Sequence, residues 1–365
     1  MTTLAMPSRR TGQSRLVIAV ALLAALAISV AALIWAKWLP YERKTVALTG
    51  THHWSGHSIL SAGGVRPGDA PSWHAATSFA SAYLKSIWHA LVAALLISAA
   101  VSALVPPGWP ARLLNRRRPI TSAAVGGLLA TPSLMCTCCT APVAATLRRE
   151  GAGTAGVVAY WLGNPLLNPA VLVFLALVAP WQWTVTRLAV GILVVVFGST
   201  LVARLAGERS DPAAGERVAG SGVAVDRHWL AAVPWRFGRA LLRLVLVMVP
   251  EYVAVVLLVG AVRGWLFPLG GAGGVRAGVL VLLLAAVVGT LIVIPTGGEI
   301  PIVLGLAAAG VSLGGVGALL LTLPAASLPA MAMLVRSLGW RATLASAGVV
   351  LLGGLVAGGA LTALG

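Results

Sequence analysis

The sequence predicts an all-α polytopic membrane protein that contains an internal repeat. The chain of 365 residues is 59% hydrophobic and only 10% charged, and its mean hydropathy is +0.94. These values lie outside the range of soluble domains. The repeat is visible in proline and glycine positions that recur later in the chain at one constant offset: Pro142, Gly151 and Pro165 match Pro301, Gly310 and Pro324.

The net charge of +17 and the pI near 11.6 would suggest a nucleic-acid partner in a soluble protein. Here the arginines fall mostly in short loops between apolar runs. This is the positive-inside pattern, so the charge indicates membrane orientation and we expect no nucleic-acid partner.

Residues 1–40 are predicted to form an N-terminal cytoplasmic tail and a signal-anchor helix. Arg9, Arg10 and Arg15 precede an apolar run over residues 16–36. That run is long enough to cross a core of roughly 30 Å and too long for the core of a cleavable signal peptide. Polar residues 41–75 are predicted to form an external loop. We therefore expect a multi-pass protein of the inner (cytoplasmic) membrane with its N-terminus in the cytoplasm.

Residues 76–206 are predicted to form the first transmembrane repeat. An apolar segment at 76–105 is followed by a basic loop that ends at Arg118, then by the cysteine segment 120–147, then by Arg148 and Arg149. Arginines at both ends indicate that the cysteine segment enters and leaves on one side, as a re-entrant hairpin with its turn at Pro132 to Pro142. Residues 154–180 and 184–206 then cross outward and back.

Residues 207–232 are predicted to be a cytoplasmic linker, and residues 233–365 a second transmembrane repeat with its own hairpin at about 277–309. Each half is predicted to contain three crossings and one hairpin. Because three is an odd number, the two halves are predicted to have opposite orientations in the membrane, as in many secondary transporters. The leg over residues 276–294 is long enough to span the bilayer at about 1.5 Å per residue. Full crossings in place of hairpins, which would make the repeats parallel, therefore remain an alternative.

The three cysteines of the chain lie within four residues, at a break between prolines: Cys136, Cys138 and Cys139. Soft thiolates at this density favour a single thiophilic centre such as Cu(I), As(III) or Sb(III). The alternative is that they are small buried residues that only help helices to pack. We expect Cys136 and Cys138 to bind the substrate, with Cys139 assisting.

Other polar residues interrupt apolar runs and are candidates to line a substrate path. Asn164 and Asn168 each precede a proline, which leaves amides beside freed carbonyl groups. Thr296 and Ser327 occupy the corresponding breaks of the second half, where the amides are missing. The alternative is a kink that serves packing alone.

Two carboxylates lie in apolar segments, Glu299 between two prolines and Glu251 directly after Pro250. A charge at membrane depth costs about 2.5 to 3.5 kcal/mol even on the lenient insertion scale. We therefore expect Glu299, or else Glu251, to couple transport to protons. Lys85 and His89 are candidate partners for one of these acids.

The cysteine motif Cys136-Thr137-Cys138-Cys139-Thr140-Ala141-Pro142 and the Asn-Pro motif at 164–169 resemble the predicted permeases of the organoarsenical-efflux type. The similarity extends over roughly residues 76–360. It implies export of trivalent organoarsenicals, with thiol capture by Cys136 and Cys138. The sequence differs from the family pattern in Leu134, Thr137 and the added Cys139, and its second copy has no cysteine.

Together the residues predict a secondary transporter that exports a thiophilic metal, metalloid or sulfur compound. The expected partners are the lipid bilayer, a small thiophilic substrate and protons as the coupling ion. We expect no enzymatic activity and no cofactor, because Walker, Ser-His-Asp and HExxH patterns are missing from the sequence. The alternative is a membrane thiol–disulfide electron carrier that uses Cys136 and Cys138, although such carriers normally need a second cysteine pair.

Overall fold

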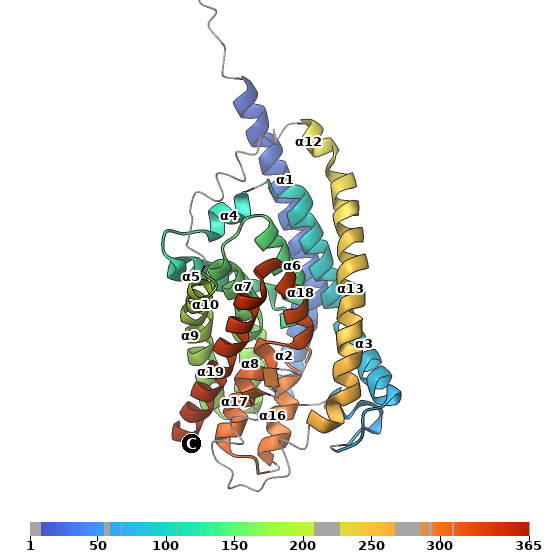
Figure 1. The fold of residues 1–365 in the computed structure, drawn as a ribbon, viewed down its shortest axis with the longest axis vertical. Coiled ribbons are helices and arrows are strands. Elements are labelled where there is room, and N and C mark those ends of the chain that lie inside the picture. Colours follow the sequence, from blue (N-terminus) through green and yellow to red (C-terminus); the bar gives the residue numbers. More distant parts are fainter. Residues whose placement is uncertain are drawn as a thin grey trace, which may run out of the picture.

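The computed structural model describes residues 9–54, 59–66, 68–106, 108–207, 227–266, 286–287, 289–290, 294–308 and 310–364. Within these ranges all regular structure is helical (Figure 1). Six of the described helices are long and apolar enough to cross a membrane, and a bent helix pair raises the number to seven. The all-α, multi-pass prediction is confirmed.

The N-terminal helix is longer than predicted. Helix α1 (Arg9–Leu33) continues through a π-helical turn, η1 (Ile34–Trp38), into α2 (Leu39–Thr51). The predicted boundary at residue 40 therefore falls inside a helix, and residues 41–51 are helical instead of forming a loop. Pro40 lies in the first turn of α2, where its missing N–H is tolerated, and the π turn before it absorbs the irregularity. The helix ends at His52, which has φ of 50°.

The first half follows a short 3-10 turn, η2 (Ile59–Gly64), and consists of these elements: α3 (Trp73–Leu104), α4 (Trp109–Leu114), α5 (Pro119–Ala130), η3 (Thr131–Ser133), α6 (Thr137–Arg149), α7 (Thr154–Leu166), α8 (Pro169–Val178), α9 (Trp181–Leu193), η4 (Val194–Gly198) and α10 (Ser199–Leu205). Helices α5 and α6 have 12 and 13 residues, or about 18 to 20 Å each. Each is too short to cross a core of roughly 30 Å, so the two form a helical hairpin.

The second half contains α12 (Arg227–Ala231), α13 (Val233–Leu266), α16 (Glu299–Ala308), α17 (Leu313–Ala325), α18 (Leu328–Leu338) and α19 (Trp340–Leu364). Helices α17 and α18 are bent by 51° at their junction. Most of the leg at 276–294, on which the choice between hairpin and full crossing depends, lies outside the described residues, as does most of the linker 207–232.

The repeat seen in the sequence extends to the helix boundaries. Helices α7, α8 and α9 begin at residues 154, 169 and 181, and α17, α18 and α19 begin at 313, 328 and 340. The three pairs of helix starts are separated by one constant offset, and it is the same offset that relates Pro165 to Pro324. The helix boundaries thus follow the repeat that the prolines and glycines predict.

Matched helices of the two halves pack against each other in opposite directions. A Cβ added at Gly198 would overlap the side chain of Val349, and one added at Gly353 would overlap that of Val194. Residue numbers thus fall along one helix as they rise along the other. Figure 1 shows the same relation, with α19 running down to the C-terminus beside α9 and α10. Small residues at the contact allow this close approach.

Close helix contacts also hold the cysteine hairpin against α7. A Cβ at Gly126 of α5 would clash with the carbonyl oxygen of Gly156, and one at Gly163 would lie 3.3 Å from the Cα of Gly127. Only glycine fits where two helix backbones approach this closely. The hairpin is therefore fixed along α7, and its turn lies near the α7–α8 junction.

Candidate functional site

The chain reverses direction between α5 and α6 just before the cysteines. A single 3-10 turn, η3, is followed by Leu134 in the left-handed region with φ of 50°, and Cys136 is the N-cap of α6. The predicted turn at Pro132 to Pro142 is wrong at its far end, because α6 continues through Pro142. A proline at this position removes one helical hydrogen bond, the one to the Cys138 carbonyl. That carbonyl therefore lacks its helical donor beside the cysteine sulfurs.

The three cysteines converge at this turn. The sulfur of Cys136 lies 3.2 Å from that of Cys138 and 2.9 Å from that of Cys139. All three are free thiols, all are buried, and their sulfurs lie within 4.8 Å of one another. A set of two or three sulfurs at this spacing can bind one soft centre. The structure thus brings together the cysteines that the sequence singled out.

Tyrosines surround the site. The chain has four. The Tyr83 hydroxyl lies 3.1 Å from the Cys138 sulfur, and the ring of Tyr252 lies 6.2 Å from that of Tyr83. Tyr41 and Tyr160 contact the polar residues described below. These tyrosines were not predicted as site residues. Their signal was that every tyrosine lies in or beside an apolar run.

One turn of the N-terminal helix contacts residues from both halves of the chain. Lys37 is only 6% exposed, and its Nζ donates to the Tyr41 hydroxyl at 3.1 Å and to the Thr296 hydroxyl at 3.3 Å. The next residue, Trp38, donates its indole N–H to the Pro132 carbonyl at 2.9 Å. Lys37 and Trp38 thus contact the break before α16 and the turn that precedes Cys136. Lys37 was not predicted as a site residue, because it directly follows the apolar run over residues 16–36.

Glu299 begins α16 and forms a buried ion pair. Its Oε1 accepts a hydrogen bond from Arg187 of α9 at 2.8 Å, and the two side chains are 1% and 0% exposed. The same Arg187 nitrogen donates to the Pro165 carbonyl at 2.9 Å. Gly297, with φ of 81°, provides the turn before α16. The ion pair therefore joins the start of α16 to the proline break of α7.

Arg187 replaces the partners that were expected for this acid. Lys85 is exposed, and His89 packs against Trp35 and Trp88 with ring centroids 4.9 and 3.7 Å apart. Neither residue forms an ion pair with Glu299 or Glu251 in the described structure. Arg187 was not predicted as the partner of Glu299, because it lies in an apolar segment that was interpreted only as a membrane crossing.

Asn164 fastens the hairpin turn to α7. Its Oδ1 accepts hydrogen bonds from the Ser133 hydroxyl and, at 3.4 Å, from the Met135 N–H. Its Nδ2 donates to the Tyr160 carbonyl at 2.8 Å. The side chain is fully buried and uses both ends of its amide. Its position supports the turn that carries the cysteines.

Asn168 and Ser327 occupy matched positions of the repeat, at the two helix breaks. Asn168 caps α8 by accepting hydrogen bonds from the N–H groups of Ala170 and Val171 at 3.1 and 3.3 Å. Its buried Nδ2 and the buried hydroxyl of Ser327 have no hydrogen-bond partner among the described residues. Buried polar groups without a partner are costly, which makes these two atoms candidates to contact a substrate or water.

The breaks of the two halves are joined directly. The Thr137 hydroxyl donates to the Pro324 carbonyl at the α17–α18 junction, and the Trp161 indole donates to the Thr137 carbonyl at 3.1 Å. Glu251 does not pair with a residue of this network. Its partner is Arg336 at 3.6 Å, and its side chain is 21% exposed. The site is thus formed by the cysteine turn, Glu299 and the two proline breaks.

A family model described as a predicted permease matches residues 72–362. The UPF0718 protein YraQ of Escherichia coli (strain K12) is 36% identical over 333 residues, which are 91% of this chain and 92% of that protein. No solved structure matches the chain. The family match begins immediately before α3, so the helix that carries Lys37 precedes it.

Proposed function

The chain belongs to the predicted permease family, and on that premise we propose that it is a secondary transporter that exports a thiophilic metal, metalloid or sulfur compound. Family membership and the apolar helices make it an integral, multi-pass membrane permease, and the proposal assigns it no enzymatic activity. The observation that carries the substrate class is the convergence of three buried thiols within 4.8 Å. We place it in the cell membrane with a cytoplasmic N-terminus, as the arginine distribution predicts.

A trivalent arsenical is the substrate that this chemistry suits best. A compound of the type R–As(OH)₂ exchanges each hydroxyl for a cysteine sulfur, and each exchange transfers the thiol proton to the departing hydroxyl to form water. Two exchanges with Cys136 and Cys138 form two As–S bonds and release two waters, with no oxidant or reductant needed. Cys139 is close enough to replace either thiol, since its sulfur lies 2.9 Å from that of Cys136. Hydrolysis of the As–S bonds reverses the reaction and releases the substrate.

The Lys37 ammonium supports this chemistry by its position. A cation beside a buried thiol favours the thiolate, which is the nucleophile and the ligand. The Lys37 side chain is held by Tyr41 and Thr296, so its charge stays at the site. The N-terminal helix therefore contributes to the binding chemistry although it lies outside the family match.

Glu299 is proposed to couple transport to protons. As a carboxylate it holds Arg187, which in turn holds the Pro165 carbonyl at the break of α7. Protonation of Glu299 removes the charge that attracts Arg187, so the link between the second hairpin and α7 weakens. A proton on Glu299 and a change in the α7 break are thereby linked. Glu251 is the second candidate, and its exposed Arg336 partner makes its pairing weaker.

We propose that the two repeats are inverted about an axis in the membrane plane. The antiparallel packing of matched helices supports this arrangement, because Val194 approaches its own counterpart Gly353. Broken helices that meet near the middle of the membrane are the usual substrate sites of inverted-repeat transporters. The breaks at Cys136, Asn168, Glu299 and Ser327 are proposed to form such a site.

The electron-carrier alternative has one observation in its favour, the 2.9 Å separation of the Cys136 and Cys139 sulfurs. All three cysteines of the chain belong to this one cluster, so a carrier would have to receive and deliver electrons through the same thiols. The transport interpretation needs no second pair.

Everted membrane vesicles test the proposal. Wild-type vesicles should accumulate a trivalent phenylarsenical when a proton gradient is imposed, and a gradient-collapsing ionophore should abolish the accumulation. Cys136→Ser and Cys138→Ser should abolish accumulation, and Cys139→Ser should reduce it less. Mixed disulfides trapped in the single-serine variants, together with no accumulation of arsenical, antimonial or copper species by the wild type, would favour the electron carrier instead.

A further inference from the structure

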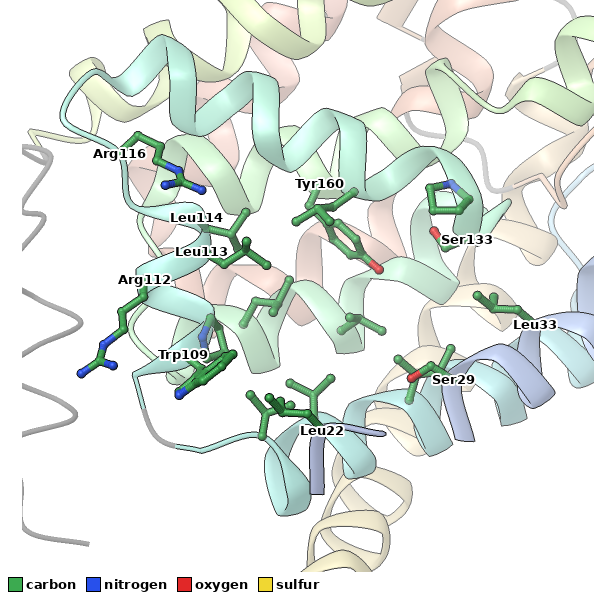
Figure 2. Close-up of a pocket in the computed structure, with 18 residues that line it drawn as sticks. Leu22, Ser29, Leu33, Trp109, Arg112, Leu113, Leu114, Arg116, Ser133 and Tyr160 are labelled. Atoms are coloured by element: carbon green, nitrogen blue, oxygen red, sulfur yellow. The ribbon is translucent and has the colours of Figure 1, made fainter. Parts of the chain in front are cut away.

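A large cavity lies beside the cysteine hairpin and is separate from the thiol cluster. It has a volume of about 650 Å³ and lies between α1, α3, α4, the hairpin and α7. Figure 2 shows Trp109, Arg112 and Arg116 at one end and Ser133 and Leu33 at the other. Its wall is almost entirely apolar side chains, and it is within the usual size range of small-molecule sites.

The cavity is about as long as one leaflet of a bilayer is deep. It follows α1 from Leu22 to Leu33, a distance of about 16 Å for eleven residues of helix. This is half of a hydrocarbon core of roughly 30 Å, which is the depth of one leaflet. Trp109, which is 39% exposed, lies at the same end of the cavity as Arg112 and Arg116. Tryptophan is enriched at membrane interfaces, so this end fits the interfacial level.

The end of the cavity at Trp109 carries positive charge that no described acidic residue neutralises. Arg112 and Arg116 are exposed and line the cavity, and neither guanidinium has an ion-pair or hydrogen-bond partner among the described residues. Arg117 and Arg118 follow in the same loop. Basic pockets between transmembrane helices are complementary to anionic lipid headgroups.

We propose that this cavity binds one anionic phospholipid, with an acyl chain along α1 and the phosphate held by Arg112 and Arg116. The length of the cavity fits one acyl chain of one leaflet, and the charge at its mouth fits the headgroup. A zwitterionic lipid supplies the same chain but no net negative charge for the two arginines. The site therefore selects anionic over zwitterionic phospholipid.

The bound chain contacts the element that carries the thiols. The inner end of the cavity is formed by Pro132 and Ser133, the residues that bind Trp38 and Asn164 at the hairpin turn. Val143 of α6 lines the same wall. An acyl chain in this position fills the space between α1 and the hairpin, so the lipid stabilises the turn that presents Cys136.

Native mass spectrometry of the purified full chain tests the site, with phosphatidylglycerol and phosphatidylcholine of identical acyl chains added in turn. Two arginines at an anionic headgroup are worth about 30-fold in affinity. The wild type should therefore bind phosphatidylglycerol at least 10-fold more tightly than phosphatidylcholine. The double variant Arg112→Gln/Arg116→Gln should lose that preference. The matched variant Arg117→Gln/Arg118→Gln removes the same charge from the same loop but not from the cavity, and it should keep the preference.

A cavity-filling variant provides the independent arm. Leu129 lines the cavity and is 39% exposed, so Leu129→Trp can occupy the space without disturbing the buried core. It should weaken binding of both lipids. The proposal is overturned if the wild type binds the two lipids equally, if both arginine pairs contribute equally, or if Leu129→Trp binds as the wild type does. None of these measurements depends on the transported substrate, so their failure leaves the proposed transport function standing.

Discussion

Replacing Arg187 by methionine should destabilise the protein strongly, because it leaves the Glu299 carboxylate buried without its counter-charge. The two side chains are 0% and 1% exposed, and their charged atoms lie 2.8 Å apart. Removing one member of such a pair costs about 3 to 5 kcal/mol. The substitution also removes the hydrogen bond to the Pro165 carbonyl, whose loss costs about 1 to 3 kcal/mol more.

The double variant Arg187→Met/Glu299→Met should be much less damaging than either single change. Replacing both members of a buried pair by apolar residues is often neutral or stabilising. Only the unpaired Pro165 carbonyl then remains, so the expected loss is about 1 to 3 kcal/mol. Each single variant leaves one unpaired buried charge and the double variant leaves none, so the coupling energy from the double-mutant cycle should be about 6 kcal/mol or more.

Unfolding in mixed micelles, followed by tryptophan fluorescence, measures these free energies. Arg336→Met is the matched control, because it removes an arginine from the Glu251 pair, in which Arg336 is 64% exposed. Exposed ion pairs are worth about 0 to 1 kcal/mol, so this variant should behave almost as the wild type does. An Arg187→Met variant as stable as Arg336→Met, or a coupling energy near zero, would refute the reasoning about the buried pair.

Three further variants test other parts of the structure. Gly126→Ala should lower the melting temperature, because its Cβ would clash with the Gly156 carbonyl oxygen, whereas Gly348→Ala, with nothing within 4 Å, should not; equal shifts would contradict the close packing of α5. Lys37→Met should slow alkylation of the cysteines by N-ethylmaleimide at neutral pH while Lys37→Arg retains it, and unchanged rates would show that the charge does not act on the thiols. Single cysteines placed at residues 118 and 149 of a cysteine-free chain should be labelled from the same side, and labelling from opposite sides would exclude the hairpin.

The sequence was sufficient to predict the features that depend on spacing along the chain. Apolar runs identified the membrane helices, and the constant offset that relates Pro165 to Pro324 predicted a repeat that the helix starts follow. The spacing of Cys136, Cys138 and Cys139 also predicted that their sulfurs could converge, because Cys136 and Cys138 are spaced as in soft-metal loops and Cys139 is adjacent.

The partners of the buried charges could not be predicted in this way. Arg187 and Glu299 are 112 residues apart, and Lys37 and Thr296 are 259 residues apart, so only the tertiary arrangement brings them together. A single cation in an apolar run shows that a partner must exist but not which one.

The residue at which the hairpin turns could not be predicted from the sequence pattern either. The prolines predicted a break that extends to Pro142, yet Pro142 lies inside α6. The reversal occurs at Leu134, a residue type that rarely adopts φ of 50°. Packing against α7 and the hydrogen bonds of Asn164 hold the chain in this conformation, and neither can be derived from local propensity.

Arsenic K-edge absorption spectroscopy of the purified protein loaded with a trivalent phenylarsenical tests the sulfur site most directly. The proposed function predicts that the wild type binds one arsenic per chain through two or three sulfur atoms. Cys136→Ser should lose at least one sulfur ligand and most of the binding, because the Cys136 sulfur is the one within 3.2 Å of both others. Arsenic coordinated only by oxygen, or bound equally well by wild type and Cys136→Ser, would contradict a thiol-lined substrate site.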